Sequence, residues 1–492
     1  MHLDYFFQKM KSYFSGTDVA VFAIVFLYLS IGIARVAFGV VPIYLLVALV
    51  PMFFIALLRP TAGVYAAIFL TVIFERFFAL EALQFGRDAV KLYPLDVVLL
   101  GVYGGALAKL WFGKARFVWK AADVWLAIFF ALVSVYFIAS FAGFGSSEAA
   151  VAFSTWKNYV FYGALVFALP LMLTDESDVR RLVGYFLTAA TLALFFLMIG
   201  VIRGEGLWTE FTPLSTAGVR LLAFPHAFYF SLAFLGLFAT AAYWLRSRYR
   251  ALMWIAMALW MFGIFGSLMR HLWVGIAFAA LGIFLLLLDQ PARQAVRRMA
   301  VIALASGTAF LALWLFVAFL FPMSGASRAF QSSAQTVAVR ILSIGSGADE
   351  SISWRGSVWQ SAFAKLAENP LFGTGLGLRI PVESGEYHDF VEIRNIHNSW
   401  LALLVQMGII GYFVFAAALI VRVWNMYRLR TEAVWLAALR NATLALFAYQ
   451  AIVLLAQPYL ETNLLGIFFW VTLGLMSTAS WLESAPDGKH AL

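Results

Sequence analysis

Long apolar runs alternate with short polar connections along most of the chain. An apolar run of about 20 residues is long enough to cross a bilayer as a helix. The pattern therefore predicts about fourteen transmembrane helices, or about twelve or thirteen if 251–288 forms one broken hairpin. The predicted spans are roughly 19–35, 40–58, 61–79, 95–112, 122–144, 157–173, 182–202, 220–245, 251–268, 272–288, 300–321, 398–421, 437–456 and 462–482.

Composition places the chain in the membrane class. Hydrophobic residues make up 64% of its 492 residues and charged residues only 12%, whereas a soluble domain is nearer half apolar and a quarter charged. The alternating pattern of an outer-membrane barrel is missing, which leaves helices as the spanning structure. The sequence has no cysteine, which excludes disulfides, thiolate catalysis and cysteine metal sites.

Charge orients the predicted helices. Short loops rich in Lys and Arg stay in the cytoplasm, and with the N-terminus inside, every strongly basic loop falls on that side. The residues assigned to inner loops are Arg59, Lys109, Lys114, Arg116, Lys120, Arg180, Arg181, Arg246, Arg248, Arg250, Arg293, Arg297, Arg298, Arg422, Arg428 and Arg430. The short outer loops carry mainly Arg87, Lys91 and Arg203. The net charge of +9 thus reflects topology, and no nucleic-acid partner is expected.

These assignments divide the chain into five regions. They are an amphipathic cytoplasmic N-terminus at 1–18, a transmembrane helical bundle at 19–321, a periplasmic loop lobe at 322–397, C-terminal transmembrane helices at 398–482 and a cytoplasmic tail at 483–492. The predicted fold class is an all-α polytopic membrane protein with about 12–14 transmembrane helices and one large outer lobe.

The outer lobe contains a predicted helix and a glycine-rich turn. Apolar residues recur at helical spacing in "ESISWRGSVWQSAFAKLAEN", and Asn369-Pro370 ends this helix. The following "FGTGLG" has glycines at 373, 375 and 377. Such glycines either let the backbone approach a ligand or form a turn. Because no strand is predicted before them, we favour a turn that returns the chain to the membrane.

Arginines lie at the outer ends of several spans. Arg220 opens the span 220–245, and Arg270 in "GSLMRHLWVG" lies between two apolar runs with almost no loop. An arginine at such a position either snorkels to the interface or is functional. Guanidinium groups bind phosphate through a bidentate fork. A cluster that includes Arg355 of the outer lobe could neutralise a diphosphate without a metal.

His397 stands at the start of an apolar run. From Ser399 to Val421 the sequence has no charged residue, so His397 is expected where water meets lipid. Asn395 or Asn398 could cap the helix that begins there. His397 is either a polar interface residue or a general base, since a neutral imidazole near pH 7 can accept a proton.

The remaining titratable residues have simpler interpretations. His226 is predicted to be a satisfied buried histidine and His388 a loop-surface residue, whereas His271 could assist its arginine neighbour. Glu75-Arg76 is the main feature that would suit a transporter or flippase, the competing class of protein. No inverted repeat supports that class.

Three motifs resemble the O-antigen ligase and polymerase superfamily. "IHNSWLALLVQMGIIGYFVF" resembles its histidine motif, with Gly408 and Gly411 as the Gly-x-x-Gly pair. "GSLMRHLWVG" is similar to its Ser-Arg segment, and "WRGSVWQSAFAKLAENPLFGTGLG" to its loop pattern. The motifs cover about residues 260–420. His271 is a departure, because the family pattern more often has a small residue there.

The resemblance implies a metal-independent, inverting glycosyltransferase of the polytopic GT-C type, without a cofactor, in the bacterial inner membrane among its lipids. The donor would be a glycan on undecaprenyl diphosphate at the periplasmic face. The acceptor would be lipid A–core for a ligase, a second lipid-linked unit for an O-antigen or exopolysaccharide polymerase, or a protein hydroxyl for an O-oligosaccharyltransferase. We favour the ligase.

The resemblance also assigns roles to residues. It matches His397 to the family's essential histidine, proposed as the general base on the acceptor hydroxyl. The predicted site residues are His397 as the catalytic base, Arg220, Arg270 and Arg355 as diphosphate ligands, and Asn398 and His271 as supporting residues, with no metal ligand. The prediction requires these side chains, far apart in sequence, to converge on one pocket that faces the periplasm.

Overall fold

The computed structural model describes most of the chain. The described residues are 15–38, 42–79, 83–85, 90–144, 149–203, 222, 224–245, 247–288, 350–377, 379–384, 387–393 and 396–484, with isolated positions between 290 and 301. Arg220, Asn395, both chain ends and nearly all of the predicted span 300–321 lie outside them. The boundaries of the five predicted regions therefore stay a prediction.

Helices form at each predicted span that the structure describes. In the first half of the chain they are α2 (Gly16–Phe38), α3 (Pro42–Leu58), α4 (Pro60–Ala79), α5 (Pro94–Trp111), α6 (Ala121–Ser140), α7 (Ala149–Trp156), the π-helix η1 (Lys157–Phe161), α8 (Leu165–Met172), α9 (Glu176–Leu192) and α10 (Leu194–Arg203). In the second half they are α11 (Phe224–Ala239), α12 (Ala241–Trp244), α13 (Arg250–Gly266), α14 (Arg270–Gly282), the π-helix η3 (Ile283–Leu287), α17 (Glu350–Glu368), α18 (Ser399–Arg428), α19 (Val434–Val453), the 3₁₀-helix η4 (Tyr459–Glu461) and α20 (Asn463–Ser484). Eight of the described helices are long and apolar enough to cross a membrane. The prediction of an all-α polytopic membrane protein is confirmed.

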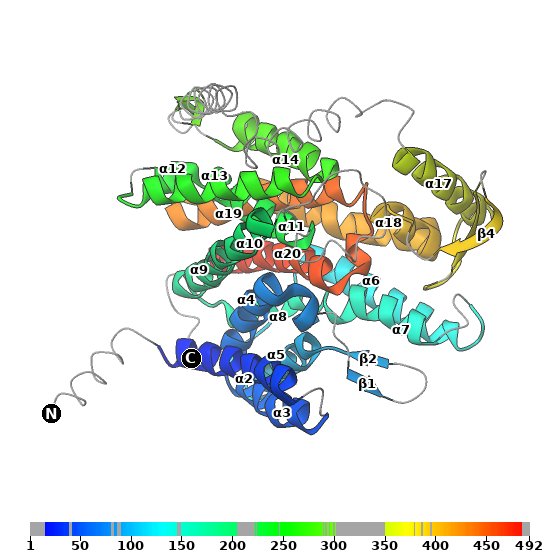
Figure 1. The fold of residues 1–492 in the computed structure, drawn as a ribbon, viewed down its shortest axis with the longest axis horizontal. Helices are drawn as coiled ribbons and strands as arrows, with labels where there is room; N and C mark the ends of the chain where they lie inside the picture. Colours follow the sequence, from blue (N-terminus) through cyan, green and yellow to red (C-terminus); the bar gives the residue numbers. More distant parts are fainter. Residues whose placement is uncertain are drawn as a thin grey trace.

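Two short antiparallel hairpins accompany the described helices. Strand β1 (Leu83–Phe85) pairs with β2 (Val90–Leu92), and β3 (Ile380–Ser384) pairs with β4 (Tyr387–Ile393). In Figure 1 both hairpins and α17 lie at the right of the molecule, whereas α2 begins and α20 ends at the left. This arrangement fits the predicted opposite sides of the bilayer, although the compartment that each end faces stays a prediction.

Helix α20 forms the centre of the bundle. It packs against α8, α19, α18 and α4 (Figure 1), and every residue from Asn463 to Ala479 is buried. A small residue permits the closest approach, since a Cβ on Gly474 would lie 2.5 Å from a methyl group of Leu169 on α8. A helix that is apolar on every face is expected in such a central position.

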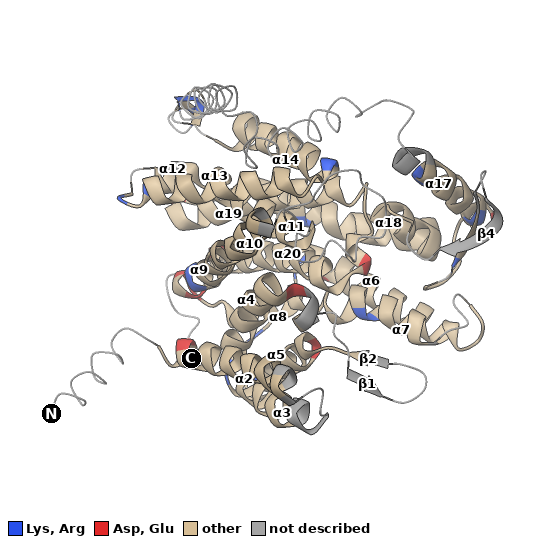
Figure 2. Ribbon diagram, viewed as in Figure 1, with Lys and Arg blue, Asp and Glu red and all other residues tan. Residues whose placement is uncertain are grey.

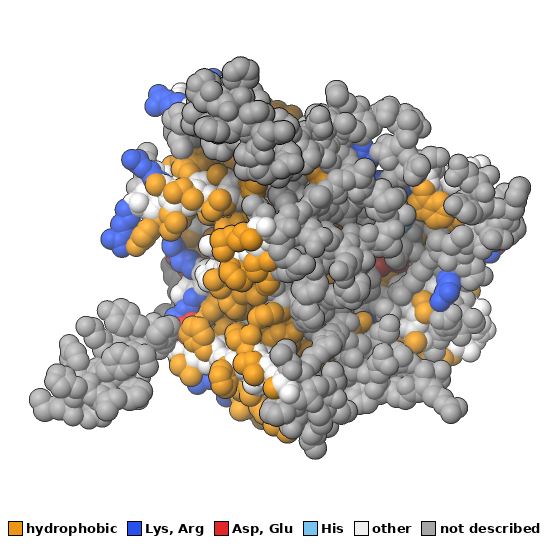
Figure 3. All heavy atoms as spheres, viewed as in Figure 1, with side chains coloured by type: hydrophobic (Ala, Val, Ile, Leu, Met, Phe, Trp, Pro, Cys, Tyr) orange, Lys and Arg blue, Asp and Glu red, His pale blue; other side chains and the backbone are white. Residues whose placement is uncertain are grey.

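The surface of the bundle is strongly apolar. Large side chains such as Phe26 on α2 and Phe262 on α13 are more than half exposed. Figure 3 shows exposed hydrophobic side chains as a broad band with Lys and Arg at its left edge, and Figure 2 shows few charges on the ribbons between the two ends. An exposed apolar surface of this extent is typical of a membrane-contacting face.

Helix α18 is broken at Gly408, which has a φ of 62°. The predicted glycine-rich turn fills the break: the Thr374 amide donates to the Val405 carbonyl at 2.8 Å. A Cβ on Gly373 would lie 2.5 Å from the Gly408 nitrogen, so the approach requires glycine. The segment is thus a turn packed against a membrane helix, and its amides satisfy carbonyls that the broken helix would leave unpaired.

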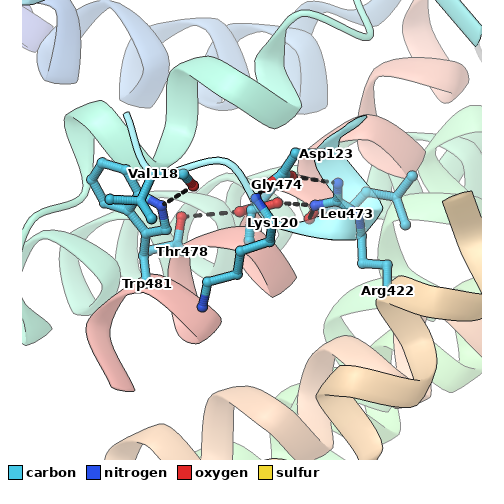
Figure 4. Close-up of polar contacts among 9 residues, drawn as sticks. Val118, Lys120, Asp123, Arg422, Leu473, Gly474, Thr478 and Trp481 are labelled. Atoms are coloured by element: carbon cyan, nitrogen blue, oxygen red, sulfur yellow. Dashed lines mark hydrogen bonds and ion pairs between the residues drawn. The ribbon is translucent and has the colours of Figure 1, made fainter. Parts of the chain in front are cut away.

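Helix α18 also extends past the predicted end of its span. The sequence assigns Arg422 to an inner loop, and this prediction is wrong: Arg422 lies inside α18 and is 5% exposed. Its guanidinium contacts Asp123 Oδ1 on α6 at 2.8 Å and the Leu473 carbonyl of α20 at 3.3 Å (Figure 4). A charge after an apolar run suggests the end of a span, but a partner on another helix allows that charge to be buried.

Candidate active site

His397 lies directly before the first turn of α18. The side chain of Asn398 caps this helix by accepting the backbone N–H groups of Trp400 and Leu401, both at 3.1 Å. The cap satisfies amides that have no partner within the helix. The capping predicted for Asn398 is confirmed, and it fixes the backbone on which His397 sits.

The backbone of His397 adopts an uncommon conformation. Its φ is +55°, in the left-handed region that residues other than glycine rarely occupy. Strain of this kind persists where surrounding contacts hold it, and it clusters at functional sites. The imidazole is half-buried, and its Nδ1 lies 3.3 Å from the side-chain oxygen of Gln457. The backbone and the side chain of His397 are therefore both held in place.

Gln457 belongs to a short turn between α19 and α20, residues 457–461, which we call the η4 turn. Ser399 joins this turn to α18: its hydroxyl donates to the Gln457 carbonyl at 2.8 Å and accepts the Leu460 amide at 3.3 Å. The Ser399 amide donates to the Leu454 carbonyl at 2.8 Å. Ser399 is fully buried, so these contacts fix the η4 turn beside His397.

The η4 turn reaches α14 through Tyr459. The Tyr459 hydroxyl lies 2.6 Å from His271 Nε2, and its ring packs against Phe224 and Phe228 with centroid distances of 6.4 and 5.4 Å. Burial raises the pKa of Tyr459, so the phenol keeps its proton. Arg270 is the first residue of α14 and directly precedes His271 in the sequence.

Arg355 approaches the same place from α17. Trp359 on α17 donates its indole N–H to the Ile396 carbonyl at 3.1 Å, and Val358 is buried in one apolar cluster with Ile396. Residues four apart share a helix face, so Arg355 lies on the side of α17 that faces residue 396. Burial is the main cause of the lowered pKa of His397 and of the raised pKa of Tyr459; the charge of Arg355 adds to the first shift and partly offsets the second.

These surroundings make His397 a neutral imidazole. Burial lowers its pKa below the ordinary value, because the charged form loses hydration. The nearby charge of Arg355 lowers the pKa further, and the hydrogen bond with Gln457 acts in the opposite direction. The net effect is a lowered pKa, which leaves His397 unprotonated and able to accept a proton at neutral pH.

Buried polar side chains anchor the η4 turn to two other helices. Gln406 of α18 donates its side-chain amide to Glu461 Oε1 at 2.5 Å, and Asn158 of η1 donates to the Glu461 carbonyl at 2.6 Å. The indole N–H of Trp470 donates to the Asn158 carbonyl at 2.9 Å. Neither Asn158 nor Gln406 was predicted from the sequence to belong to the site. The available signal was a polar residue inside an apolar run, which is costly in a membrane unless it has a partner.

The structure brings some predicted site residues together. His397 and Arg355 lie at one end of the bundle, and His271 joins them through Tyr459. Arg270 lies next to His271 in the sequence, whereas Arg220 lies outside the described residues. Within the described ranges no group of three or more His, Asp and Glu side chains could hold a metal ion.

His226 lies on α11 and has its polar contacts with α4. It is 1% exposed, with Nδ1 3.8 Å from Glu75 Oε2 and Nε2 3.4 Å from the Ile73 carbonyl. The predicted burial of His226 is therefore confirmed, but the prediction that it is satisfied is not: Nε2 has the Ile73 carbonyl as its partner, whereas the buried Nδ1 makes no hydrogen bond within the described part of the chain. Glu75 is itself 4% exposed. The side chain of His388 lies outside the described residues.

Comparison with known proteins identifies one family that part of the chain matches. Residues 254–416 match the family model described as O-antigen ligase. A comparison with curated proteins gave no match. The matched region runs from α13 into α18, so it contains Arg270, Arg355 and His397 but not the η4 turn. This match confirms, for residues 254–416, the resemblance to the O-antigen ligase and polymerase superfamily that the sequence predicts.

Proposed function

We propose that this protein is a membrane glycosyltransferase that moves a glycan from undecaprenyl diphosphate to an acceptor hydroxyl at the periplasmic face. The ligase reaction onto lipid A–core is the favoured form. The observation that carries the proposal is the position of His397 beside the η4 turn and α17, the helix of Arg355, with the His271–Tyr459 pair on the same turn. Both His397 and Arg355 lie inside the O-antigen ligase region.

The proposed reaction is a single displacement. The acceptor hydroxyl gives its proton to His397, and its oxygen forms a bond with the anomeric carbon of the donor glycan. The bond from that carbon to the diphosphate breaks, and its electron pair leaves with the diphosphate. Attack from the opposite side inverts the anomeric centre. General base catalysis of this kind contributes typically about 10²–10⁴-fold.

In this reaction the arginines stabilise the leaving diphosphate. The lipid diphosphate gains negative charge as the bond breaks, and guanidinium groups already in place stabilise that charge without reorganisation. A bidentate fork also fixes the orientation of the phosphate. Arg270 and Arg355 would carry this role among the described residues, with Arg220 as the third predicted ligand.

The first prediction tests the transfer itself. The purified protein in liposomes should transfer a glycan from undecaprenyl diphosphate to lipid A–core, and the reaction should continue in excess EDTA, because arginine neutralises the diphosphate. The product is measured by gel mobility and mass spectrometry. Parallel reactions offer a second lipid-linked unit or a protein hydroxyl as acceptor. A reaction that stops in EDTA and returns with Mg²⁺ would contradict the metal-independent scheme.

The second prediction concerns the arginines. Arg355→Ala and Arg270→Ala should each lower kcat/KM by about 10²-fold, since each removes a donor to the leaving diphosphate. The lysine variants should lose less, because they keep the charge but not the fork. Initial rates at varied donor concentration give the measurement. Lys365→Ala is the matched control, since Lys365 lies on the same helix as Arg355 and pairs with Glu368.

Equal rates for the alanine and lysine variants at either position would show that the fork is not used there. Wild-type rates for Arg355→Ala would remove Arg355 from the site.

A further inference from the structure

Gln457 is the side chain through which the η4 turn contacts His397. Its amide oxygen lies 3.3 Å from His397 Nδ1. An amide oxygen can only accept a hydrogen bond, so the contact requires the proton of the neutral imidazole to be on Nδ1. The unprotonated nitrogen is then Nε2, which is the atom available to take a proton from an acceptor.

We propose that Gln457 is a positioning residue for glycan transfer: it holds His397 in the tautomer and orientation that leave Nε2 free to act as the base. The proposal rests on the transferase function proposed above and adds a residue outside the O-antigen ligase region at 254–416. A group that orients a catalytic histidine through its second nitrogen is a general requirement of such sites.

The backbone around Gln457 is built to hold this contact. Ser399 lies two residues after His397, and its hydroxyl donates to the Gln457 carbonyl at 2.8 Å. The same hydroxyl accepts the Leu460 amide. The Ser399 hydroxyl therefore holds the Gln457 backbone next to the segment that contains His397, and the η4 turn cannot shift relative to the start of α18 without breaking these hydrogen bonds.

The chemistry of an amide suits this position better than that of a carboxylate. A carboxylate beside Nδ1 would raise the pKa of the imidazole and favour its charged form, whereas the amide orients the ring without adding charge. The η4 turn does contain a carboxylate, Glu461, but its Oε1 accepts from Gln406 instead. The charged group that acts on His397 is Arg355 on α17. Tyr459 lies on the η4 turn, and His271, its partner, follows Arg270 at the start of α14.

Kinetics of two variants test the proposal. Gln457→Leu should lower kcat by about 10-fold or more with little change in KM, because substrate contacts stay while the base loses its orientation. Gln457→Glu should move the acidic limb of the kcat–pH profile to higher pH by about one unit, because the new carboxylate stabilises the imidazolium. The matched control is Gln360→Glu, which adds the same charge at an exposed position of α17.

A merely structural role for Gln457 would lower the amount of folded enzyme without moving the pH profile. If Gln457→Glu keeps the wild-type profile and Gln457→Leu keeps the wild-type kcat, the proposal is overturned.

Nitrogen NMR provides a readout that does not depend on activity. In ¹⁵N-histidine-labelled protein, the signals lost in His397→Gly identify His397. The wild type should show Nδ1 protonated and Nε2 unprotonated, and Gln457→Leu should lose this preference. A wild-type Nε2–H tautomer would contradict the role of Gln457. Absent transfer activity together with the expected tautomer would instead contradict the proposed function, so the two failures can be told apart.

Discussion

Replacing His397 with glycine should lower the kcat of glycan transfer by about 10²–10⁴-fold, while binding of the lipid-linked donor stays close to that of the wild type. The variant removes the base but leaves the arginines that hold the diphosphate. Glycine is the suitable replacement because His397 has a φ of +55°, which glycine adopts without strain and alanine does not. Single-turnover transfer and donor binding are measured in the same liposomes.

The His397→Gly variant also allows chemical rescue. Added imidazole can occupy the space left by the side chain and accept the proton, so it should restore part of the rate in this variant and none in Arg355→Ala. Transfer at the wild-type rate by His397→Gly would remove the histidine from the mechanism. Loss of donor binding together with transfer would assign His397 to binding instead of catalysis.

The pH dependence follows from the surroundings of His397. A general base works only when neutral, so kcat falls as the pH drops through the pKa of the imidazole. Because burial and Arg355 lower this pKa, the wild-type enzyme should stay active below the ordinary histidine value of about 6.5. Arg355→Ala removes a positive charge that disfavours the imidazolium. Its remaining activity should therefore show an acidic limb at higher pH than the wild type.

The sequence was sufficient to predict the membrane helices, because each span is defined by a local run of apolar residues. The runs at 95–112 and 437–456, for example, coincide closely with α5 and α19. The break at Gly408 was not predicted as a break, since its cause is not local. It depends on the close approach of Gly373, which is 35 residues earlier in the chain.

The candidate site was predicted only in part, because its contacts also join residues that are far apart in the sequence. Motif resemblance pointed to His397, which directly precedes an apolar run, and to Arg355 in the amphipathic segment 350–369. The contacts of the η4 turn could not be predicted, because a hydrogen bond such as the one between Gln406 and Glu461 joins residues 55 positions apart. Periodicity describes one helix at a time and contains no information about which helices are neighbours.

Arg422 also makes a contact between distant parts of the chain that the sequence did not predict. Its replacement should have the second large effect, on the free energy of unfolding. Its ion pair with Asp123 joins α18 to α6, and both side chains are 5% exposed (Figure 4). Arg422→Met should lower the free energy of unfolding by about 3–5 kcal/mol, because it leaves the Asp123 carboxylate buried without its cation. Thermal unfolding in detergent, followed by tryptophan fluorescence, provides the measurement.

Arg428→Met is the matched control. Arg428 lies on the same helix but is exposed, with its guanidinium 4.3 Å from the centre of the Trp424 ring. An exposed contact of this kind contributes only about 0.5–1 kcal/mol. If Arg422→Met and Arg428→Met lose a similar free energy of unfolding, the buried position of the ion pair does not increase its effect on stability.

A second substitution separates the unpaired charge from the lost contact. Asp123 Oδ2 also accepts the backbone N–H of Lys120 at 3.1 Å, and the oxygen of an asparagine can keep this cap while removing the charge. Arg422→Met/Asp123→Asn should therefore be more stable than Arg422→Met alone, although it contains one more change. If the double variant is instead less stable, the cost arises from the packing of the arginine side chain. The buried carboxylate would then be solvated by other groups in the variant.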